Sequence, residues 1–414
     1  MIPLNEAIDT VLAAVRPLGA EHVELLDALG RTAATEVVSP EPVPSFDNSA
    51  MDGFAVAAVD LSDSTAGPTG EGLVIVDELP AGRVATRPLA RGQAVRIMTG
   101  APLPAGADTV VQVEHTREHD GRVVVERAPE PGSNVRLAGE DVRPGDVVLP
   151  AGALVGPAEV GLLASIGVHR LRVARRPRVA ILATGSELVP VGEPLKPGQI
   201  HNSNSMTAYG QTLAAGAEPV LLGIARDDPD ETRRLIARAL DEDVTITSGG
   251  VSVGDFDFVK AVEDELGVER LFWRVATKPG KPVVFGRRGD HLVFGAPGNP
   301  VAAMVSFELY VRPALLALQG RTDLWRPWVF AAAAEPVERT RERVEVRRCR
   351  LERDADGGWL FTTTGPQGSG ILRSMALAHG LALVPSDYFG GPAGERFVVL
   401  LLEGSRPERP PFPD

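Results

Sequence analysis

Two lysines separated by a proline and a glycine are the most chemically suggestive residues of this chain. Lys278 and Lys281 form the ends of Lys-Pro-Gly-Lys, in a chain with only four lysines among its 42 lysine and arginine residues. A compact ammonium group suits point-charge contact with a phosphate or another oxyanion. The alternative is a solvated turn, because Pro-Gly is a common turn pair. The pattern favours an oxyanion site and leaves the plain turn open.

A glycine loop stands a short distance before these lysines. The run 244–247 is rich in β-branched residues and predicts a buried strand, which leads directly into the loop. Glycines let backbone amides approach an anion closely, and the segment after Gly254 predicts a helix whose positive end can face the same ligand. We therefore expect four substrate-binding residues here: Ser248, Gly249, Gly250 and Ser252.

The loop belongs to a segment in which predicted strands and helices alternate. From Pro177 onward the chain predicts strands at 179–183, 219–224 and 244–247, with helices at 205–215 and 229–240 between them. This alternation predicts a largely parallel sheet with helices on both faces. Ligands of such sheets bind beyond the carboxyl ends of the strands.

Carboxylates follow each of these three strands. Asp228 precedes a proline and lies three residues before Glu231, a pattern that predicts a helix cap and capping box. Glu187, Asp227 and Asp257 have no such role. Carboxylates beside lysines and an anion loop suit a divalent cation that bridges phosphate oxygens, so we expect a metal here. For Asp227 a solvated surface position is the alternative.

Two earlier loops and one later loop are further candidates. Asp52 lies in a polar run that predicts either an elaborate turn or a carboxylate offered to a ligand. Thr99 follows a predicted strand and precedes two prolines, which predicts a stiff loop presenting a hydroxyl or a plain connector. Pro297 and Pro300 predict a rigid loop before a helix, as a pocket wall or a simple helix entry.

The rest of the chain predicts separate folding units. An amphipathic helix is expected over the first twenty residues, ending near Gly19, and a second helix over 151–166. Short β-branched runs between about 70 and 150 predict a small, mainly β unit, and residues 326–414 predict another. In the latter, arginines 347, 348 and 350 form either a solvated face or an oxyanion contact.

Bulk composition excludes several classes of protein. A net charge of -13 and a pI near 5.2 exclude general nucleic-acid binding, which requires a basic face. The single cysteine, Cys349, excludes an internal disulfide and agrees with a reducing compartment. No apolar run approaches the roughly 18 residues that span a bilayer, and the N-terminus lacks the pattern of a secretory signal. We expect a cytoplasmic protein that binds no membrane.

Seven motifs, in order, resemble those of the molybdopterin molybdenumtransferases, a family that includes the C-terminal part of gephyrin. They are FDNSAMDGFAV, RIMTGAPLPAGAD, ILATGSEL, GQIHNSN, TSGGVSVGDFDFVK, KPGKPVVFG and GAPGNPVAA. The resemblance covers essentially the whole chain. It implies an enzyme that inserts molybdate into adenylylated molybdopterin and releases AMP, with Mg²⁺ as the cation.

The resemblance also assigns roles to matching residues. It implies a functional set of residues around the pterin phosphate, the metal and the adenylate: Asp52, Thr99, Glu187, Asp227, Asp257 and Lys278. The implied molybdate pocket comprises Lys278, Lys281, Arg348 and Ser369, with Pro297 and Pro300 as the rigid loop. Asp52, Glu187 and Asp257 would hold the metal. Arg274 stands where some relatives carry lysine, and Arg347 or Arg350 could replace Arg348 in the looser final domain.

The implied fold is a multidomain α/β chain that forms an elongated homodimer. Its expected parts are a linking and dimerisation domain (1–44 with 141–175), an inserted mainly-β domain (45–140), a three-layer α/β molybdopterin-binding domain (176–325) and a C-terminal β domain (326–414). The active site would be shared between subunits, which would explain why Asp52 and Thr99 lie so far in sequence from Lys278. The alternatives are a molybdopterin adenylyltransferase and a non-enzymatic binding scaffold.

Overall fold

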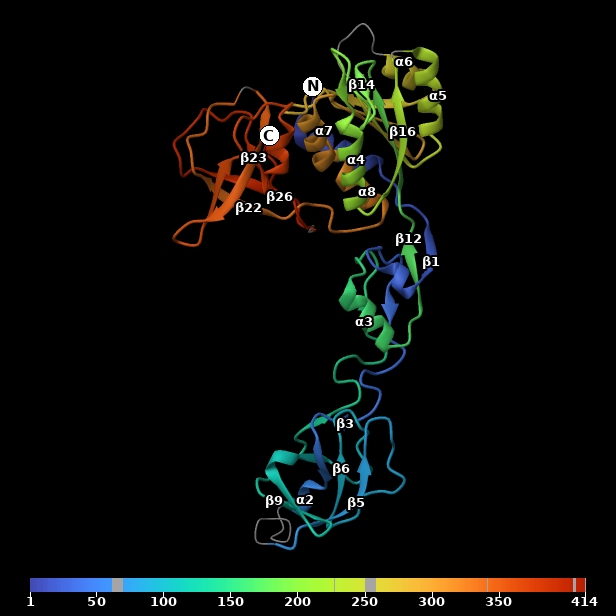
Figure 1. The fold of residues 1–414 in the computed structure, drawn as a ribbon, viewed down its shortest axis with the longest axis vertical. Helices are drawn as coiled ribbons and strands as arrows, with labels where there is room; N and C mark the ends of the chain where they lie inside the picture. Colours follow the sequence, from blue (N-terminus) through green and yellow to red (C-terminus); the bar gives the residue numbers. More distant parts are fainter. Residues whose placement is uncertain (62–69, 227, 250–257, 341, 405–406, 414) are drawn as a thin grey trace.

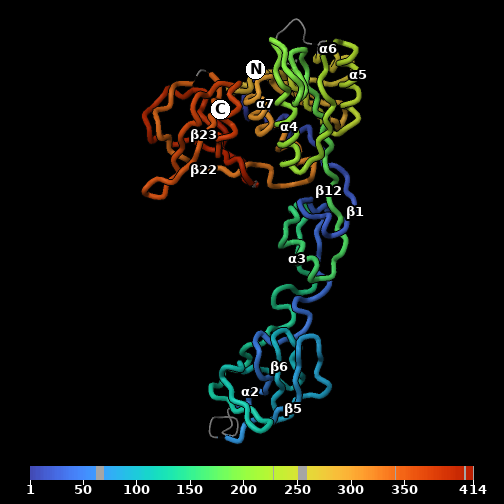
Figure 2. The backbone as a smooth tube through the Cα atoms, in the orientation of Figure 1, coloured from blue at the N-terminus to red at the C-terminus, as the bar shows by residue number. Residues whose placement is uncertain are grey.

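The protein is elongated, with most of its mass at two ends. The computed structural model describes residues 1–61, 70–226, 228–249, 258–340, 342–404 and 407–413. Figure 1 shows an α/β domain beside a C-terminal barrel at one end, an inserted β domain at the other, and a slender linking region between them. The tube in Figure 2 shows the chain passing through the linking region in both directions. The prediction of a multidomain α/β protein is confirmed.

The α/β domain is built on a six-stranded sheet with the order β16-β13-β17-β21-β20-β18. The first four strands are parallel, and β20 and β18 add an antiparallel edge that the sequence analysis did not predict. The strands span Glu218–Ala225 (β16), Arg178–Thr184 (β13), Val244–Ser248 (β17), His291–Ala296 (β21), Val284–Arg288 (β20) and Glu269–Trp273 (β18).

Helices cover both faces of this sheet, as predicted. One face packs on α5 and α6 through a cluster that includes Leu182, Ile236 and Val262. The other face packs on the largest core of the protein. The helices are α5 (Pro229–Ala239) and α6 (Phe258–Glu265) on the first face, and α1 (Leu4–Ala14), α4 (Ser203–Ala214), α7 (Pro300–Ser306), η3 (Phe307–Val311) and α8 (Arg312–Leu318) on the second.

Two predicted helices are shorter than expected because of prolines. The first ends at Ala14 rather than near Gly19, since Pro17 disfavours helical backbone in the residue before it. Helix α3 spans Pro157–Ser165 rather than 151–166. Its proline occupies the first helical position, and the side chain of Glu159 accepts a hydrogen bond from the Gly156 amide at 2.9 Å.

The inserted β domain contains a six-stranded sheet with the order β7-β4-β6-β5-β9-β8. Phe54 and Val111 belong to the core on one face, and Ala55 and Val110 to the core on the other. The alternating side chains of each strand therefore serve two cores. The strands are Thr109–Gln112 (β7), Gly53–Val56 (β4), Gln93–Ile97 (β6), Leu73–Leu79 (β5), Arg122–Val125 (β9) and Thr116–His119 (β8).

The linking region joins this domain to the rest through paired crossings of the chain. Strand β1 (Ala20–Glu24) pairs with β12 (Arg170–Ala174), and β2 (Val37–Val38) pairs with β11 (Val147–Leu149). Helix α3 lies against them, and Leu149, Leu163 and Val173 contribute to their small core. Two antiparallel crossings thus make one narrow connection (Figure 1).

The C-terminal barrel closes because β23 pairs with both β24 and β25. Its strands are β22 (Trp328–Ala333), β23 (Val344–Arg353), β24 (Trp359–Thr363), β25 (Gly380–Val384) and β26 (Arg396–Leu401). Cys349 is buried inside it. Val344, Leu381 and Leu400 of the barrel belong to the same apolar core as the α/β domain. The two domains are therefore packed as one body at this end of the molecule.

The stretch from α7 to α8 is long and apolar enough, by length and composition alone, to cross a membrane. It covers Pro300–Leu318, and 83% of its apolar window is buried inside the protein. The sequence shows no uninterrupted apolar run here because Glu308 and Arg312 stand within it. Its burial identifies it as a core helix of the α/β domain.

Candidate active site

The lysine turn is anchored at the junction between the α/β domain and the barrel. Lys278 belongs to β19 (Thr277–Lys278), which pairs with β23, and its Nζ donates a hydrogen bond to Glu345 Oε1 at 2.9 Å. Pro279 and Gly280 are buried, whereas both lysines are exposed. The turn thus presents two ammonium groups from a fixed base.

Helix α7 packs against the buried side of this turn. Gly280 has a φ of +100°, and a Cβ added there would lie 3.1 Å from Ser306 Oγ and 3.4 Å from Thr277 Oγ1. The backbone conformation favours glycine here, and Ser306 of α7 leaves little room for a side chain. The position of the two lysines is therefore set by packing against α7.

The glycine loop is held by the ends of the neighbouring strands. Gly249 has a φ of +92°, and a Cβ there would lie 2.5 Å from the carbonyl oxygen of Thr184 at the end of β13. Its amide donates to the Ala296 carbonyl at the end of β21, at 3.2 Å. Three strand ends therefore meet at Ser248 and Gly249, as the parallel sheet predicts. Gly250 and Ser252 lie outside the described residues.

The carboxylates at these strand ends differ in how they are placed. Glu187 is exposed, and its carboxylate folds over Gly185, where an added Cβ would lie 2.4 Å from Oε2. Asp228 caps α5 by accepting from the Glu231 amide at 2.8 Å, as predicted. The reciprocal half of the predicted capping box was wrong, because Glu231 accepts from the Arg226 amide instead. Asp227 and Asp257 lie outside the described residues.

Asp52 and Thr99 lie together in the inserted β domain. Asp52 Oδ1 accepts from both the backbone amide and the hydroxyl of Thr99, each at 2.7 Å. These hydrogen bonds lower the pKa of Asp52 below its ordinary value, the backbone amide contributing most. Two loops that the sequence suggested separately thus form one ionised, exposed unit. Figure 1 shows this domain at the opposite end of the molecule from the α/β domain.

The three arginines of β23 have three different environments. Arg347 pairs with Glu345, at 2.9 Å, and Arg350 is exposed. Arg348 is fully buried; it donates to Ser374 Oγ and to the Gly368 carbonyl, each at 3.0 Å. Burial lowers the pKa of Arg348 to about 10. The interpretation of these arginines as a solvated face is wrong for Arg348, whose side chain lies under the loop 364–370.

That loop touches the start of α7. The Val301 amide donates to the Ser369 carbonyl at 3.0 Å. Pro300 occupies the first position of α7, and Pro297 is buried after the end of β21. The rigid loop 297–300 therefore lies between the glycine loop and the barrel loop that contains Ser369.

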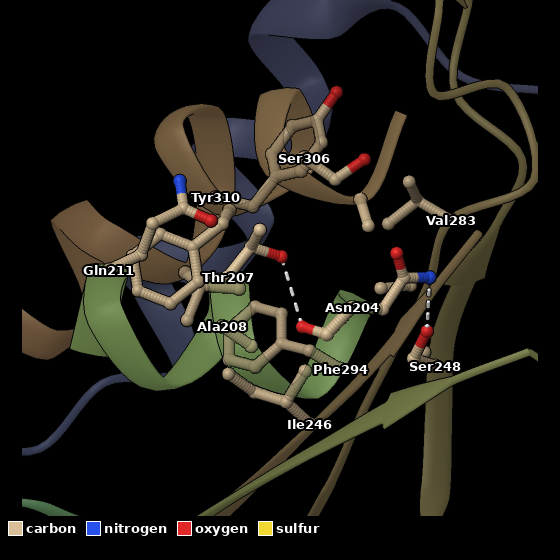
Figure 3. A pocket seen from close by; sticks show the side chains of 15 residues that line it. Asn204, Thr207, Ala208, Gln211, Ile246, Ser248, Val283, Phe294, Ser306 and Tyr310 are labelled. Carbon is tan, nitrogen blue, oxygen red and sulfur yellow. Dashed lines mark hydrogen bonds between the residues drawn. The ribbon is translucent and has the colours of Figure 1, made fainter. Parts of the chain in front are cut away.

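A small cavity of about 20 Å³ lies behind these loops. Its wall is mainly apolar, with Ile246, Val283 and Phe294 among its residues, and Asn204 and Ser248 lie on one side (Figure 3). Val283 follows the lysine turn by two residues, and Ser306 contributes to the same wall. The lysine turn and the glycine loop are therefore supported by neighbouring parts of one packed region.

The oxygen donors suit a hard cation without forming a complete protein cage. Across the described ranges, no group of three or more histidine, cysteine, aspartate or glutamate side chains could hold a metal. Mg²⁺ commonly binds one or two carboxylates and completes its shell with water and substrate phosphates. Glu187, exposed beside the glycine loop, fits that requirement.

Sequence reasoning missed two residues that organise the site, Asn204 and Glu345. Asn204 donates hydrogen bonds to Ser248 Oγ at 2.7 Å and to the Gly298 carbonyl at 2.8 Å. It stands in the motif GQIHNSN, which was the available signal. Glu345, which contacts both Lys278 and Arg347, had no local signal because its partner Lys278 is 67 residues away.

Comparison with known proteins identifies the family. The chain matches the MoeA N-terminal region (domain I and II) at residues 2–167, a probable molybdopterin binding domain at 180–317, and the MoeA C-terminal region (domain IV) at 331–402.

Relatives that match over nearly the full length of the chain belong to the same family. The chain is similar to a molybdopterin molybdenumtransferase of Bacillus subtilis, with 38% identity over 97% of this chain and 94% of the relative. It is similar to molybdopterin molybdenumtransferase 2 of Mycobacterium tuberculosis, with 39% identity over 95% and 97%. A molybdopterin biosynthesis MoeA protein of Pyrococcus horikoshii superposes with a TM-score of 0.82 and 32% identity, covering 98% and 100%. The chain belongs to the molybdopterin molybdenumtransferase family.

Proposed function

We propose that this protein inserts molybdate into adenylylated molybdopterin, forming molybdenum cofactor and releasing AMP. The observation that supports it most is the placement of Lys278 in a strand pairing between the α/β domain and the barrel. Two ammonium groups, a glycine loop and the barrel loop at Ser369 thereby surround one end of a parallel sheet, where ligands of such folds bind. The protein is a transferase whose two reactants are both anions.

The chain's own groups would work by positioning and charge neutralisation. Lys278 and Lys281 would hold molybdate together with Ser369, while the hydroxyl of Ser248 and the glycine-loop amides would hold a phosphate. Arg348, buried beneath the loop 364–370, would fix that loop through its bonds to Ser374 and Gly368. The positive groups offset the repulsion between the two anions. Holding both reactants side by side offsets the entropy of bringing them together.

A divalent cation would neutralise the phosphoanhydride. Glu187 would hold it, with Asp257 and a carboxylate from Asp52, and we propose Mg²⁺ as the ion. When bound, the ion withdraws charge from the phosphate oxygens. The hydrogen bonds from Thr99 lower the pKa of Asp52 and so favour its ionised form, which is the form that binds a cation.

The separation of Asp52 from Lys278 supports a site shared by two subunits. Within one subunit the inserted β domain and the α/β domain lie at opposite ends of the molecule (Figure 1). We propose a homodimer in which the Asp52–Thr99 unit of one subunit meets the lysine turn of the other. The linking region exposes Leu26, Leu29 and Leu154, at 79%, 50% and 43%, which suits burial against a second copy. We place the dimer in the cytoplasm.

An assay of nucleotide release tests the reaction. Purified protein is incubated with adenylylated molybdopterin and Mg²⁺, and AMP is measured with and without molybdate. We expect release that depends on molybdate. The rival activity, molybdopterin adenylyltransferase, would instead consume ATP with free molybdopterin. ATP consumption, or AMP release indifferent to molybdate, would contradict the proposal.

A further inference from the structure

Asn204 joins two loops of the site that are far apart in the sequence. It is the second residue of α4, and its side-chain amide reaches the Ser248 hydroxyl at 2.7 Å and the Gly298 carbonyl at 2.8 Å. The first contact lies in the glycine loop and the second in the rigid loop 297–300. Figure 3 shows Asn204 beside Ser248, with the bond between them drawn.

The chemistry of the two partners fixes the orientation of the amide. A carbonyl oxygen can only accept, so the Asn204 atom facing Gly298 must be the nitrogen Nδ2. The same nitrogen then donates its second hydrogen to Ser248 Oγ. Both hydrogens of the amide are used within the protein.

This arrangement determines what Ser248 can do. A serine hydroxyl has one proton to donate and two lone pairs. Asn204 occupies one lone pair, and across the described residues Ser248 Oγ donates to no protein acceptor. Among those residues its proton has no acceptor, so a phosphate oxygen that reaches this buried residue, which is 6% exposed, would accept it. Gly249 beside it lies close to Thr184 and donates to the Ala296 carbonyl, so the backbone next to Ser248 is fixed by the ends of β13 and β21.

We propose that Asn204 is a positioning residue that aims the Ser248 hydroxyl as a donor to a phosphate oxygen of the substrate. It also holds loop 297–300 against the glycine loop through the Gly298 carbonyl. This inference rests on the proposed function for the identity of the phosphate. The interloop contact itself rests on the two hydrogen bonds alone.

A double-mutant cycle tests whether Asn204 acts through Ser248. We expect Asn204→Ala to raise the KM for adenylylated molybdopterin about ten-fold, the scale of one hydrogen bond to a charged group, with little change in kcat. Ser248→Ala should have a similar effect. In the Ser248→Ala background, Asn204→Ala should add less than about two-fold. Asn204→Asp should exceed Asn204→Ala, because its carboxylate cannot donate and repels the anion.

Gln211 provides a matched control on the same helix. Its side-chain amide also bridges two groups, the Met304 carbonyl at 3.2 Å and Glu308 Oε1 at 2.9 Å, but neither is in a site loop. Gln211→Ala should leave KM and kcat unchanged. Multiplicative effects of Asn204→Ala and Ser248→Ala, or an equal rise in KM for Gln211→Ala, would overturn the proposal.

A second readout does not depend on catalysis. Amide hydrogen exchange of the unliganded protein should be faster at both 248–249 and 298–299 in Asn204→Ala, and unchanged there in Gln211→Ala. If the wild-type protein released no AMP, the proposed function would be wrong. The exchange measurement would still show whether Asn204 holds the two loops together. Unchanged exchange at both loops in Asn204→Ala would overturn the positioning role.

Discussion

The Nζ of Lys278 lies 2.9 Å from Glu345 Oε1, so a lysine of the α/β domain is paired with a carboxylate of the C-terminal barrel. The other oxygen of Glu345 lies 2.9 Å from Arg347 Nη2. One carboxylate thus connects a site lysine to the barrel strand that also contains the buried Arg348. The position of Lys278 depends on how the two domains are packed.

Removing the charge of Glu345 should destabilise this junction. The Glu345 and Arg347 side chains are only 12% and 13% exposed, so Glu345→Gln leaves a largely buried guanidinium without its negatively charged partner. We expect the free energy of unfolding to fall by about 1–3 kcal/mol, measured in urea. Glu352→Gln, at an exposed position of the same strand, should change it by less than about 0.5 kcal/mol. Equal losses in the two variants would contradict this account.

The hydroxyl of Thr99 should contribute to the low pKa of Asp52. Thr99→Val removes one of the two hydrogen bonds to the carboxylate and keeps the one from the backbone amide. We expect the pKa of Asp52 to rise toward its ordinary value, measured by carbon NMR of the side chain across an acid titration. Thr116→Val removes an exposed threonine hydroxyl elsewhere in the same domain and should leave that pKa unchanged. An unchanged pKa in Thr99→Val would refute the assignment.

Stability should fall below neutral pH because of His291. Burial is the largest cause of its lowered pKa, and the ring contacts the Glu242 carbonyl through Nδ1 at 2.7 Å and Thr245 Oγ1 through Nε2 at 2.9 Å. As pH falls through the ordinary histidine pKa of about 6.5, the unfolded chain takes up the proton first. His291 therefore makes its full contribution to stability above this pH, and that contribution is lost as pH falls below it.

Just below pH 6.5, the free energy of unfolding should fall as pH falls. The slope should be at most about 1.4 kcal/mol per pH unit, the value for the uptake of one proton. Urea unfolding of the wild type and of His291→Gln between pH 5 and 8 measures it. The variant should be less stable overall and should show a shallower slope in that window. The same slope in both proteins would show that another group is responsible.

The C-terminal tail should stabilise the connection between the α/β domain and the barrel. Phe412 packs edge-on against Trp325 with ring centroids 5.8 Å apart, and Arg409 reaches Asp9 on α1 at 2.6 Å. Phe412→Ala should lower the free energy of unfolding by roughly 1–3 kcal/mol and expose the chain to chymotrypsin at Trp325. Glu408→Ala, at an exposed neighbouring position, should do neither. Identical cleavage of both variants would contradict the role of the tail.

The local pattern of the sequence predicted the elements of the α/β domain because their signals lie within each segment. The β-branched run 244–247 became β17, and Asp228 capped α5. The same local reasoning brought Ser248 together with the ends of neighbouring strands, since the carboxyl ends of parallel strands meet at one edge.

Contacts between distant segments could not be predicted from such signals. Asp52 and Thr99 were each suggested as separate loops, and only the pairing of strands in the inserted domain brings them together. The local pattern could not separate Arg348 from Arg347 and Arg350, because which face of β23 points inward depends on closure of the barrel. Asn204 has no charge and no special backbone, so its two contacts are evident only once α4 is packed beside two loops.

Mixing two inactive variants tests the shared site most directly. Asp52→Asn and Lys281→Ala would each inactivate the protein, and the two are co-folded in equal amounts before molybdate-dependent AMP release is measured. Random pairing makes half of the dimers mixed, each with one intact site, so the account predicts about a quarter of wild-type activity. A mixture no more active than its separate components would contradict a site built from the Asp52–Thr99 unit of one subunit and the lysine turn of the other.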